Sequence, residues 1–133
     1  MKYLLDTCVI SDFARGDADT LQRVKTTSPA LIAISSISLM EIEYGLALNP
    51  SRARKLAPVM YALLKAITVL SYGKEDAQAT ATLRAALRKK GRPIGAYDVL
   101  LAGCALARGL VLVTANEQEF KRVSGLTIEN WRK

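Results

Sequence analysis

The sequence predicts an α/β fold, in which a mainly parallel central sheet is flanked by helices on both faces to give three layers, α/β/α. Short apolar runs typical of buried strands alternate with longer segments of helical period, which is the order of a doubly wound sheet. The 133 residues fit a single domain covering positions 1–133, and 50% hydrophobic with 23% charged residues is ordinary for a globular protein.

The first half of the chain is expected to supply three strands and three helices. The strands are short apolar runs, and the helices carry apolar residues at a spacing of three to four. In chain order we expect a strand at 2–5, a helical stretch through Phe13 that breaks near Gly16, a strand at 30–34, helices at 35–48 and 51–66 separated by Asn49-Pro50, and a strand at 67–70.

The second half is expected to add two longer helices and a further buried strand. The predicted elements are a helix at 74–90 ended by Gly91-Arg92-Pro93, a helix at 97–108 closed by Gly109, a strand at 110–113, a turn of helix at 117–120 and an edge strand at 126–128. Polar residues follow three of the strands, at Asp6, Ser35 and Thr114. Since ligands bind beyond the carboxyl ends of parallel strands, we expect the functional site at this edge.

Charge and composition restrict the chemistry. A net charge of +7, from 19 Lys and Arg against 12 Asp and Glu, favours a polyanionic partner such as nucleic acid or an acidic protein. The chain has no histidine, which excludes Ser-His-Asp and Cys-His nucleophilic schemes and a paired-histidine ribonuclease mechanism. Carboxylate and metal chemistry remains for hydrolysis.

The amino-terminal residues and the two cysteines bear on location. A charge appears at Asp6, too early for a signal peptide, and no apolar run approaches the roughly 18 residues of a membrane-spanning helix. We therefore expect a cytoplasmic protein with no membrane contact. Cys8 and Cys104 lack C-x-x-C spacing, so we interpret them as small core residues.

Asp6 and Asp98 are carboxylates in apolar surroundings, and each has a structural explanation beside a functional one. Asp6 lies between a strand and a helix, where aspartate is a good N-cap. Asp98 begins a helix whose next nine residues, 99–107, carry no charge and must be buried nearly all round. It is also a candidate cap, and capping does not exclude metal binding.

Glu41 is the third such acid. With Ser38 it matches the capping pattern S-x-x-E, which is a frequent helix start. At helical spacing, however, it falls in a row with Ile37, Tyr44 and Leu48, so we expect it to interrupt an inward apolar or aromatic face.

Three acids in such positions exceed what capping requires, and a buried unpaired carboxylate costs on the order of several kcal/mol. A shared divalent cation would offset that cost. Ligation by oxygen alone selects Mg²⁺ or Mn²⁺ over zinc. The sequence therefore predicts metal-assisted hydrolysis, and the basic surface indicates a phosphodiester substrate.

The chain resembles the PIN-domain ribonucleases, specifically the VapC-type toxins of type II toxin–antitoxin pairs. Four segments carry the resemblance in the order and spacing of that family: LLDTCVISDF, ISSISLMEIEYGL, GRPIGAYDVLLAGCALARGL and LVTANEQEFKRVSGLTIENW. They are distributed over nearly the whole chain, and the fold of the family agrees with the elements expected above.

The resemblance implies a set of site residues. Asp6 and Asp98 correspond to the principal Mg²⁺ ligands, and Glu41 corresponds to the third acid of the catalytic cluster. For the fourth acidic position the chain offers Asn116, Glu117 and Glu119, of which Glu119 is our choice. The supporting polar residues are Thr7, Ser38, Thr114 and Asn116. One residue departs from the family pattern: Cys8 stands where D-T-N is usual, which puts a hydrogen bond to the ligands in doubt.

The resemblance also implies the activity and the partners. Such proteins are Mg²⁺-dependent endoribonucleases, in which Mn²⁺ can substitute, and relatives with this pattern cut tRNA, several of them initiator tRNA in its anticodon stem-loop. A cognate antitoxin neutralises the toxin by placing its tail in the groove, and homodimers pair into larger complexes. Apolar residues within 47–64 serve either these contacts or the core.

Basic residues are candidates for binding RNA. Arg84 and Arg88 lie one helical turn apart, followed by Lys89 and Arg92, and a second cluster follows Pro50 at Arg52, Arg54 and Lys55. The structural alternative is a solvated helix face. The eight aromatic residues show no interleaving with basic ones, so a folded RNA recognised by shape fits better than a stacked single strand.

Other functional classes fit less well. A non-catalytic RNA-binding module of the PIN fold explains the charge but gives no reason for Glu41 and Asp98 on apolar faces. A phosphoacceptor receiver domain needs an aspartate at a central strand end, whereas the strand near residues 31–34 ends in serines. A protein-interaction role is distinguished from the toxin only by the absence of catalysis.

Overall fold

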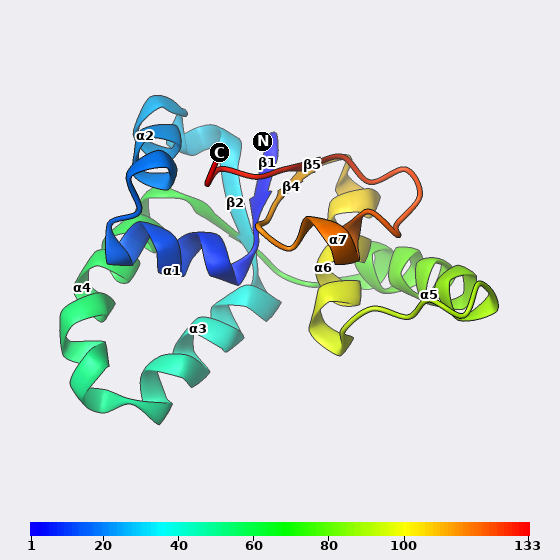
Figure 1. Ribbon diagram of the computed structural model, residues 1–133, viewed down its shortest axis with the longest axis horizontal. Helices are drawn as coiled ribbons and strands as arrows, with labels where there is room; N and C mark the ends of the chain where they lie inside the picture. Colours follow the sequence, from blue (N-terminus) through cyan, green and yellow to red (C-terminus); the bar gives the residue numbers. More distant parts are fainter.

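One parallel sheet organises the protein. In the computed structural model, which describes residues 1–133, five strands lie in the order β3-β2-β1-β4-β5, and every neighbouring pair is parallel (Figure 1). The expected parallel α/β fold is confirmed. The strands are β1 (Tyr3–Leu5), β2 (Ile32–Ser35), β3 (Thr68–Leu70), β4 (Val111–Val113) and β5 (Ile128–Glu129), the last of which begins two residues later than expected.

Seven α-helices cover the two faces. Helices α1 to α4 lie on one side of the sheet, and α5, α6 and α7 gather on the other (Figure 1). Their bounds are α1 (Thr7–Arg15), α2 (Ala18–Thr26), α3 (Ser36–Leu48), α4 (Pro50–Ala66), α5 (Lys74–Lys89), α6 (Ala96–Arg108) and α7 (Glu117–Phe120), with a 3-10 turn at Pro29–Leu31. None of these helices is long and apolar enough to cross a membrane.

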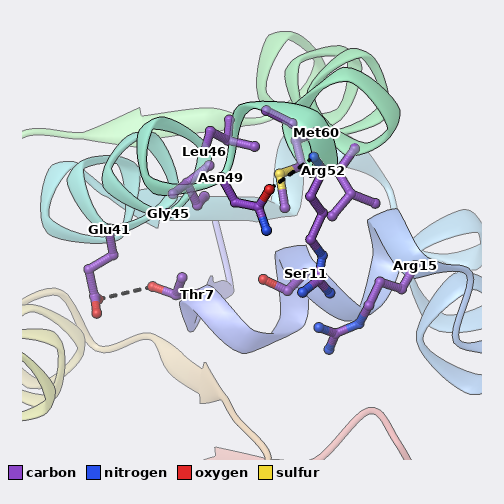
Figure 2. Close-up of a pocket in the computed structure, with 12 residues that line it drawn as sticks. Thr7, Ser11, Arg15, Glu41, Gly45, Leu46, Asn49, Arg52 and Met60 are labelled. Carbon is purple, nitrogen blue, oxygen red and sulfur yellow. Dashed lines mark hydrogen bonds between the residues drawn. The ribbon is translucent and has the colours of Figure 1, made fainter.

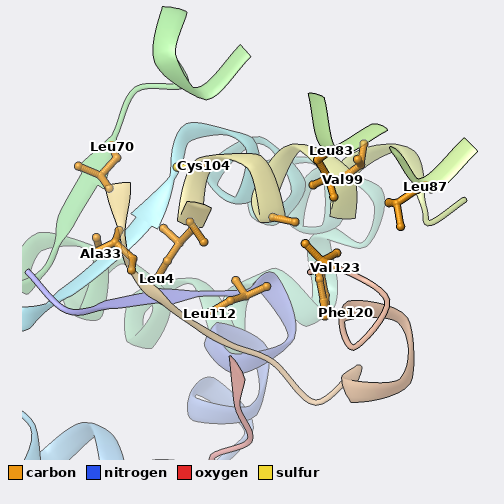
Figure 3. Packing of buried hydrophobic residues seen from close by; sticks show 13 residues of the cluster. Leu4, Ala33, Leu70, Leu83, Leu87, Val99, Cys104, Leu112, Phe120 and Val123 are labelled. Atoms are coloured by element: carbon orange, nitrogen blue, oxygen red, sulfur yellow. The ribbon is translucent and has the colours of Figure 1, made fainter. Parts of the chain in front are cut away.

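Neighbouring residues of the strands divide between two cores, because successive side chains of a strand point to opposite faces. Leu4 belongs to the cluster under α5 and α6, whereas Leu5 belongs to the cluster under α1, α3 and α4. Leu112 and Val113 divide in the same way. Figure 3 shows the first cluster, in which Leu4, Ala33 and Leu112 of the sheet meet Leu83 and Val99 of the helices. The three-layer arrangement follows from this division.

A close helix crossing holds α6 in place. A Cβ atom on Gly103 would lie 1.9 Å from Thr80 Oγ1 of α5, so only glycine fits at this position. Beside the crossing, the buried carboxylate of Asp76 accepts two hydrogen bonds from the guanidinium of Arg108, at 3.0 and 3.1 Å. Since Asp98 lies in the first turn of α6, this packing also fixes where Asp98 emerges.

The order of the strands places the site. The chain starts at the centre of the sheet with β1, extends outward through β2 and β3, and then crosses to β4 and β5 on the other side. Ligands of open parallel sheets bind where the winding reverses in this way. Leu5 is level with Val113 in the β1–β4 pair, so Asp6 and Thr114 leave the sheet side by side.

Candidate active site

Asp6 is a buried helix cap that has no cation. Its side chain is only 8% exposed, its Oδ1 accepts a hydrogen bond from the Thr7 backbone N–H at 2.7 Å, and its Oδ2 accepts one from the Thr114 hydroxyl at 2.8 Å. None of the five ion pairs in the structure includes Asp6. Burial raises the pKa of Asp6, and these hydrogen bonds offset the effect only in part. The capping interpretation is confirmed, but capping does not explain why a buried carboxylate lacks a lysine or arginine partner.

Asp98 lies in the first turn of α6 and does not cap that helix. The cap residue is Gly95, and no side chain caps the helix end. Burial, together with the negative charges of Asp6 and Glu119, raises the pKa of Asp98 to about 7. The expected burial of the rest of the helix is largely confirmed, since Val99 and 101–105 are buried. A cation bound between such carboxylates would relieve their mutual repulsion.

Glu119 of α7 is the fourth acid at this site. One carboxylate oxygen accepts the backbone N–H of Gly95, and the other accepts a hydrogen bond from Asn116 Nδ2 at 2.8 Å. The same amide nitrogen lies 3.5 Å from Asp98 Oδ2, so Asn116 links Glu119 to Asp98. The Gly95 N–H, followed by Asn116, lowers the pKa of Glu119, which therefore stays ionised beside Asp98.

Glu117 points away from the cluster. Its carboxylate accepts hydrogen bonds from Asn130 Nδ2 at 3.1 Å and from Lys133 Nζ at 2.8 Å, and these contacts lower its pKa. Of the three residues considered for the fourth position, the structure brings Asn116 and Glu119 to Asp98 and turns Glu117 elsewhere.

Glu41 joins the site from α3, although not for the reason the sequence suggested. Tyr44 and Leu48 are 63% and 66% exposed, so the row that contains Glu41 is not an inward face, and the buried face of α3 carries Ser38 and Ile42 instead. Apolar residues lie all around this helix, and periodicity therefore could not say which side meets the core. Glu41 Oε1 accepts a hydrogen bond from the Thr7 hydroxyl at 3.0 Å.

The capping pattern of Ser38 with Glu41 is also wrong. The cap of α3 lies three residues earlier, at Ser35, whose hydroxyl accepts the backbone N–H of Ile37 at 3.1 Å. Ser38 lies one turn before Glu41, fully buried, and its hydroxyl has no hydrogen-bond partner in the protein. A buried hydroxyl without a partner costs about 1–3 kcal/mol, so Ser38 has an unused bond to offer.

A groove between α1, α3 and α4 opens beside Glu41. It has a volume of about 220 Å³, and Thr7, Ser11 and Arg15 of α1 line one wall of it (Figure 2). Arg52 reaches into it from α4. Sequence reasoning missed Ser11 and Arg15, although their spacing of four residues from Thr7 is a signal that one helix face carries all three. We call this cavity the α1/α3/α4 groove.

The basic residues expected to bind RNA lie beside two different hollows. Arg84 and Arg88 line a groove of about 450 Å³ between α5 and the segment that leads into α6. Arg92 lies in a different hollow with Lys121 and Arg122. Lys89 is exposed and lines neither.

Comparisons with known proteins agree with this geometry. The family model of the PIN domain matches residues 3–126. The chain belongs to the PIN-domain family. It is 36% identical over 131 residues to a tRNA(fMet)-specific endonuclease VapC of Shigella flexneri, with 98% of both chains covered.

Solved structures of VapBC complexes share the whole fold of this PIN domain. It matches a DNA-bound VapBC of Salmonella typhimurium with a TM-score of 0.89 and 38% identity over 98% of both chains. A VapBC2 of Rickettsia felis bound to a promoter DNA fragment matches with a TM-score of 0.90 and 29% identity, covering 98% and 99% of the two chains. Within the PIN-domain family, this chain is a VapC-type ribonuclease.

The residues at the site fit the metal dependence that is general among PIN-domain ribonucleases. The atoms that could bind a metal ion are the carboxylate oxygens of Asp6, Glu41, Asp98 and Glu119. No lysine or arginine forms an ion pair with any of these residues. No three acidic or cysteine side chains lie close enough together to form a complete set of metal ligands. Burial and the neighbouring carboxylates raise the pKa of Asp98, and burial raises that of Asp6, so a cation bound beside these two groups would offset the cost of their charges.

Cys8 is the residue that departs from the family pattern. Its thiol lies 3.7 Å from Asp6 Oδ2 and donates a weak hydrogen bond there. Burial, with the charge of Asp6, raises the pKa of Cys8 to about 11, so the group is a neutral thiol. Cys8 is half-buried and packs against the core cluster under α1, α3 and α4, whereas Cys104 is fully buried as expected.

Proposed function

We propose that this protein is the toxin of a type II toxin–antitoxin pair, a Mg²⁺-dependent endoribonuclease that hydrolyses tRNA, with initiator tRNA as its first candidate substrate. One observation carries the proposal: Asp6 is a buried carboxylate with no positive partner, and the negative charges of Asp6, Glu119 and Glu41 all lie near enough to Asp98 to raise its pKa. The substrate is proposed because a relative of this length is named for tRNA(fMet).

Asp6 and Asp98 would hold Mg²⁺, and Mn²⁺ would substitute for it. When bound, the ion would lower the pKa of a water molecule and neutralise charge on the phosphate. Thr114 and the Thr7 backbone fix the orientation of Asp6 through their hydrogen bonds. Glu119 stays ionised through Gly95 and Asn116, and Glu41 is oriented by Thr7. Each holds a carboxylate beside the acids that would bind the ion, and one of the two would accept the proton of the attacking water.

An antitoxin is the proposed protein partner, because solved relatives are complexes of VapB with VapC. The large apolar side chains exposed on α3 and α4 are a suitable surface for it. They are Met40, Tyr44, Leu48, Val59 and Tyr61.

The function is tested by incubating purified protein with an initiator tRNA transcript and with total bacterial tRNA, in Mg²⁺ or in EDTA. We expect one discrete cut that EDTA and Asp98→Asn both remove. Sequencing of the fragment ends then identifies the bond. Cleavage that persists in EDTA, or full activity of Asp98→Asn, would contradict the assigned site.

Two neighbouring glutamates provide a matched pair of variants. Glu119→Gln removes the carboxylate that contacts Gly95 and Asn116, and we expect at least a hundredfold loss of kcat, about 2.7 kcal/mol. Glu117→Gln removes an equal charge two residues away, where the carboxylate pairs with Lys133, and should keep kcat within about threefold. Equal losses in the two variants would overturn the choice of Glu119.

A further inference from the structure

The α1/α3/α4 groove starts at the acidic cluster and ends at two arginines. Thr7, Ser11 and Arg15 follow one another at intervals of four residues along α1, a distance of about 12 Å from first to last. Glu41 closes the near end through its hydrogen bond with Thr7. At the far end, Figure 2 shows Arg52 extending from α4 to the level of Ser11, with Arg15 beyond it on α1, and all three residues line the groove.

The far end carries positive charge that the protein does not neutralise. Arg52 takes part in none of the five ion pairs of the structure, and its guanidinium donates no hydrogen bond within the protein. Arg15 donates one hydrogen bond to Asp12 at 2.9 Å, but Arg132 already donates two to the same carboxylate, at 2.6 and 3.0 Å. One negative charge is thus shared by two guanidinium groups, so Arg15 keeps both charge and free donors.

The groove has room for a chain of small cross-section. Gly45 contributes to its wall, and a Cβ atom there would have no neighbour within 4 Å, so that side is open. A volume of about 220 Å³ lies below the range of roughly 300–1,000 Å³ usual for small-molecule pockets. An extended strand fits such a space, and a helix does not.

We propose that Arg15, Arg52 and Ser11 form a phosphate-binding subsite that holds the RNA backbone next to the bond being cut. The proposal rests on the ribonuclease function proposed above and adds where the substrate strand lies. Guanidinium groups bind phosphate oxygens in a bidentate manner, and a hydroxyl adds a further donor. If the scissile phosphate lies at the acidic cluster, the next phosphates of the RNA strand lie on either side of it. On one side, the groove runs along α1 toward Arg15 and Arg52.

The test compares two arginines of the same helix. Arg52→Ala removes a groove residue, and Arg54→Ala removes an exposed arginine that does not line the groove. Cleavage of the initiator tRNA transcript should show KM raised about tenfold by Arg52→Ala beyond any effect of Arg54→Ala, with kcat within about threefold of wild type. Arg52→Lys keeps the charge but not the planar fork, and should fall between Arg52→Ala and wild type.

The salt dependence of tRNA binding is a second measurement, and a purely structural defect would not change it. In an Asp98→Asn background, which leaves the tRNA intact, the slope of log Kd against log salt should fall by about 0.9 for Arg52→Ala. The contacted phosphate is found with a set of anticodon stem-loop RNAs, each carrying one neutral methylphosphonate linkage. At one linkage, the substitution should weaken binding to the protein that keeps Arg52 but leave binding to the Arg52→Ala protein unchanged.

The outcomes separate the two proposals. If wild type cuts tRNA while Arg52→Ala and Arg54→Ala have equal KM values and salt slopes, the subsite is wrong, the ribonuclease function stands, and the groove belongs to a protein partner. If wild type neither binds nor cuts tRNA, both proposals fail. Thermal unfolding of each variant within about 2 °C of wild type establishes that the comparison is between folded proteins.

Discussion

Three aspartates are buried in this protein, and two of them are paired with an arginine while the third is not. Asp12, Asp76 and Asp6 are 5%, 1% and 8% exposed. Asp12 is held by Arg132 and Asp76 by Arg108, each through two hydrogen bonds. Asp6 has only neutral donors around it.

For Asp76 and Asp6, the direction of the pKa shift follows the partners rather than the depth of burial. Burial alone would raise the pKa of Asp76, but the hydrogen bonds and charge of Arg108, with the N–H of Gly73, lower it overall. For Asp6, burial prevails and the pKa is raised. The comparison teaches that a buried carboxylate with its own cation maintains structure, whereas one without is available to a cation from outside.

The largest expected effect is the loss of tRNA cleavage when Asp6, the aspartate without an arginine partner, is replaced. Asp6→Asn keeps the helix cap, because asparagine caps as well as aspartate, but it loses the charge. We expect at least a thousandfold loss of tRNA cleavage, about 4 kcal/mol, with no loss of thermal stability. Activity assays and thermal unfolding of the same preparation test this. Cleavage within tenfold of wild type would break the distinction between the two kinds of aspartate.

Asp76→Ala should have the opposite effect, a loss of stability without a loss of activity. It leaves Arg108 and the Gly73 N–H without their acceptor, so we expect unfolding free energy to fall by about 2–3 kcal/mol, with kcat preserved below the lowered Tm. Chemical denaturation measures the first quantity and tRNA cleavage at 20–25 °C, roughly room temperature, the second. A stable but inactive Asp76→Ala protein would place Asp76 in the active site and remove the contrast.

The pH dependence of stability sharpens the comparison at Asp98. Its pKa in the folded protein is about 7 and that of an unfolded aspartate is near 3.9, so the folded state binds more protons between these values. Stability from this group is therefore present at low pH and is lost as the pH rises toward 7.

In EDTA, Asp98→Asn should be more stable than wild type by about 1 kcal/mol at pH 8, a figure reduced for the half-exposed side chain, and should gain little at pH 5. Thermal unfolding at both pH values measures the difference. A gain of equal size at pH 5 would show that its origin is not the charge of Asp98.

The smallest expected effect is at Cys8. Cys8→Asn replaces a weak thiol donor to Asp6 by an amide, so Mn²⁺ affinity should tighten by about threefold or less. Titration of Mn²⁺ followed by electron paramagnetic resonance measures this directly. Weaker Mn²⁺ binding by Cys8→Asn would show that the site is adapted to the thiol.

Sequence reasoning recovered the strands, most helices and the residues now found together at the sheet edge, because apolar runs and strand ends are local signals. Helix α2 was missed, since its sequence is polar on average and only Thr20 of it is buried. Glu41 was found for the wrong reason, as its row faces outward. Which of Arg52 and Arg54 lines a groove depends on how α4 packs against α1, and no local pattern contains that information.

The hydrogen bond between Thr114 and Asp6 joins residues 108 positions apart, across the β1–β4 pair. During synthesis on the ribosome, Asp6 emerges early, but the strand that completes its surroundings emerges last among those that flank it. A growing chain of this kind has the acids of a nuclease without their arrangement, because long-range strand pairing must come first. The topology of the sheet thus delays the appearance of a toxic activity until most of the polypeptide has been translated.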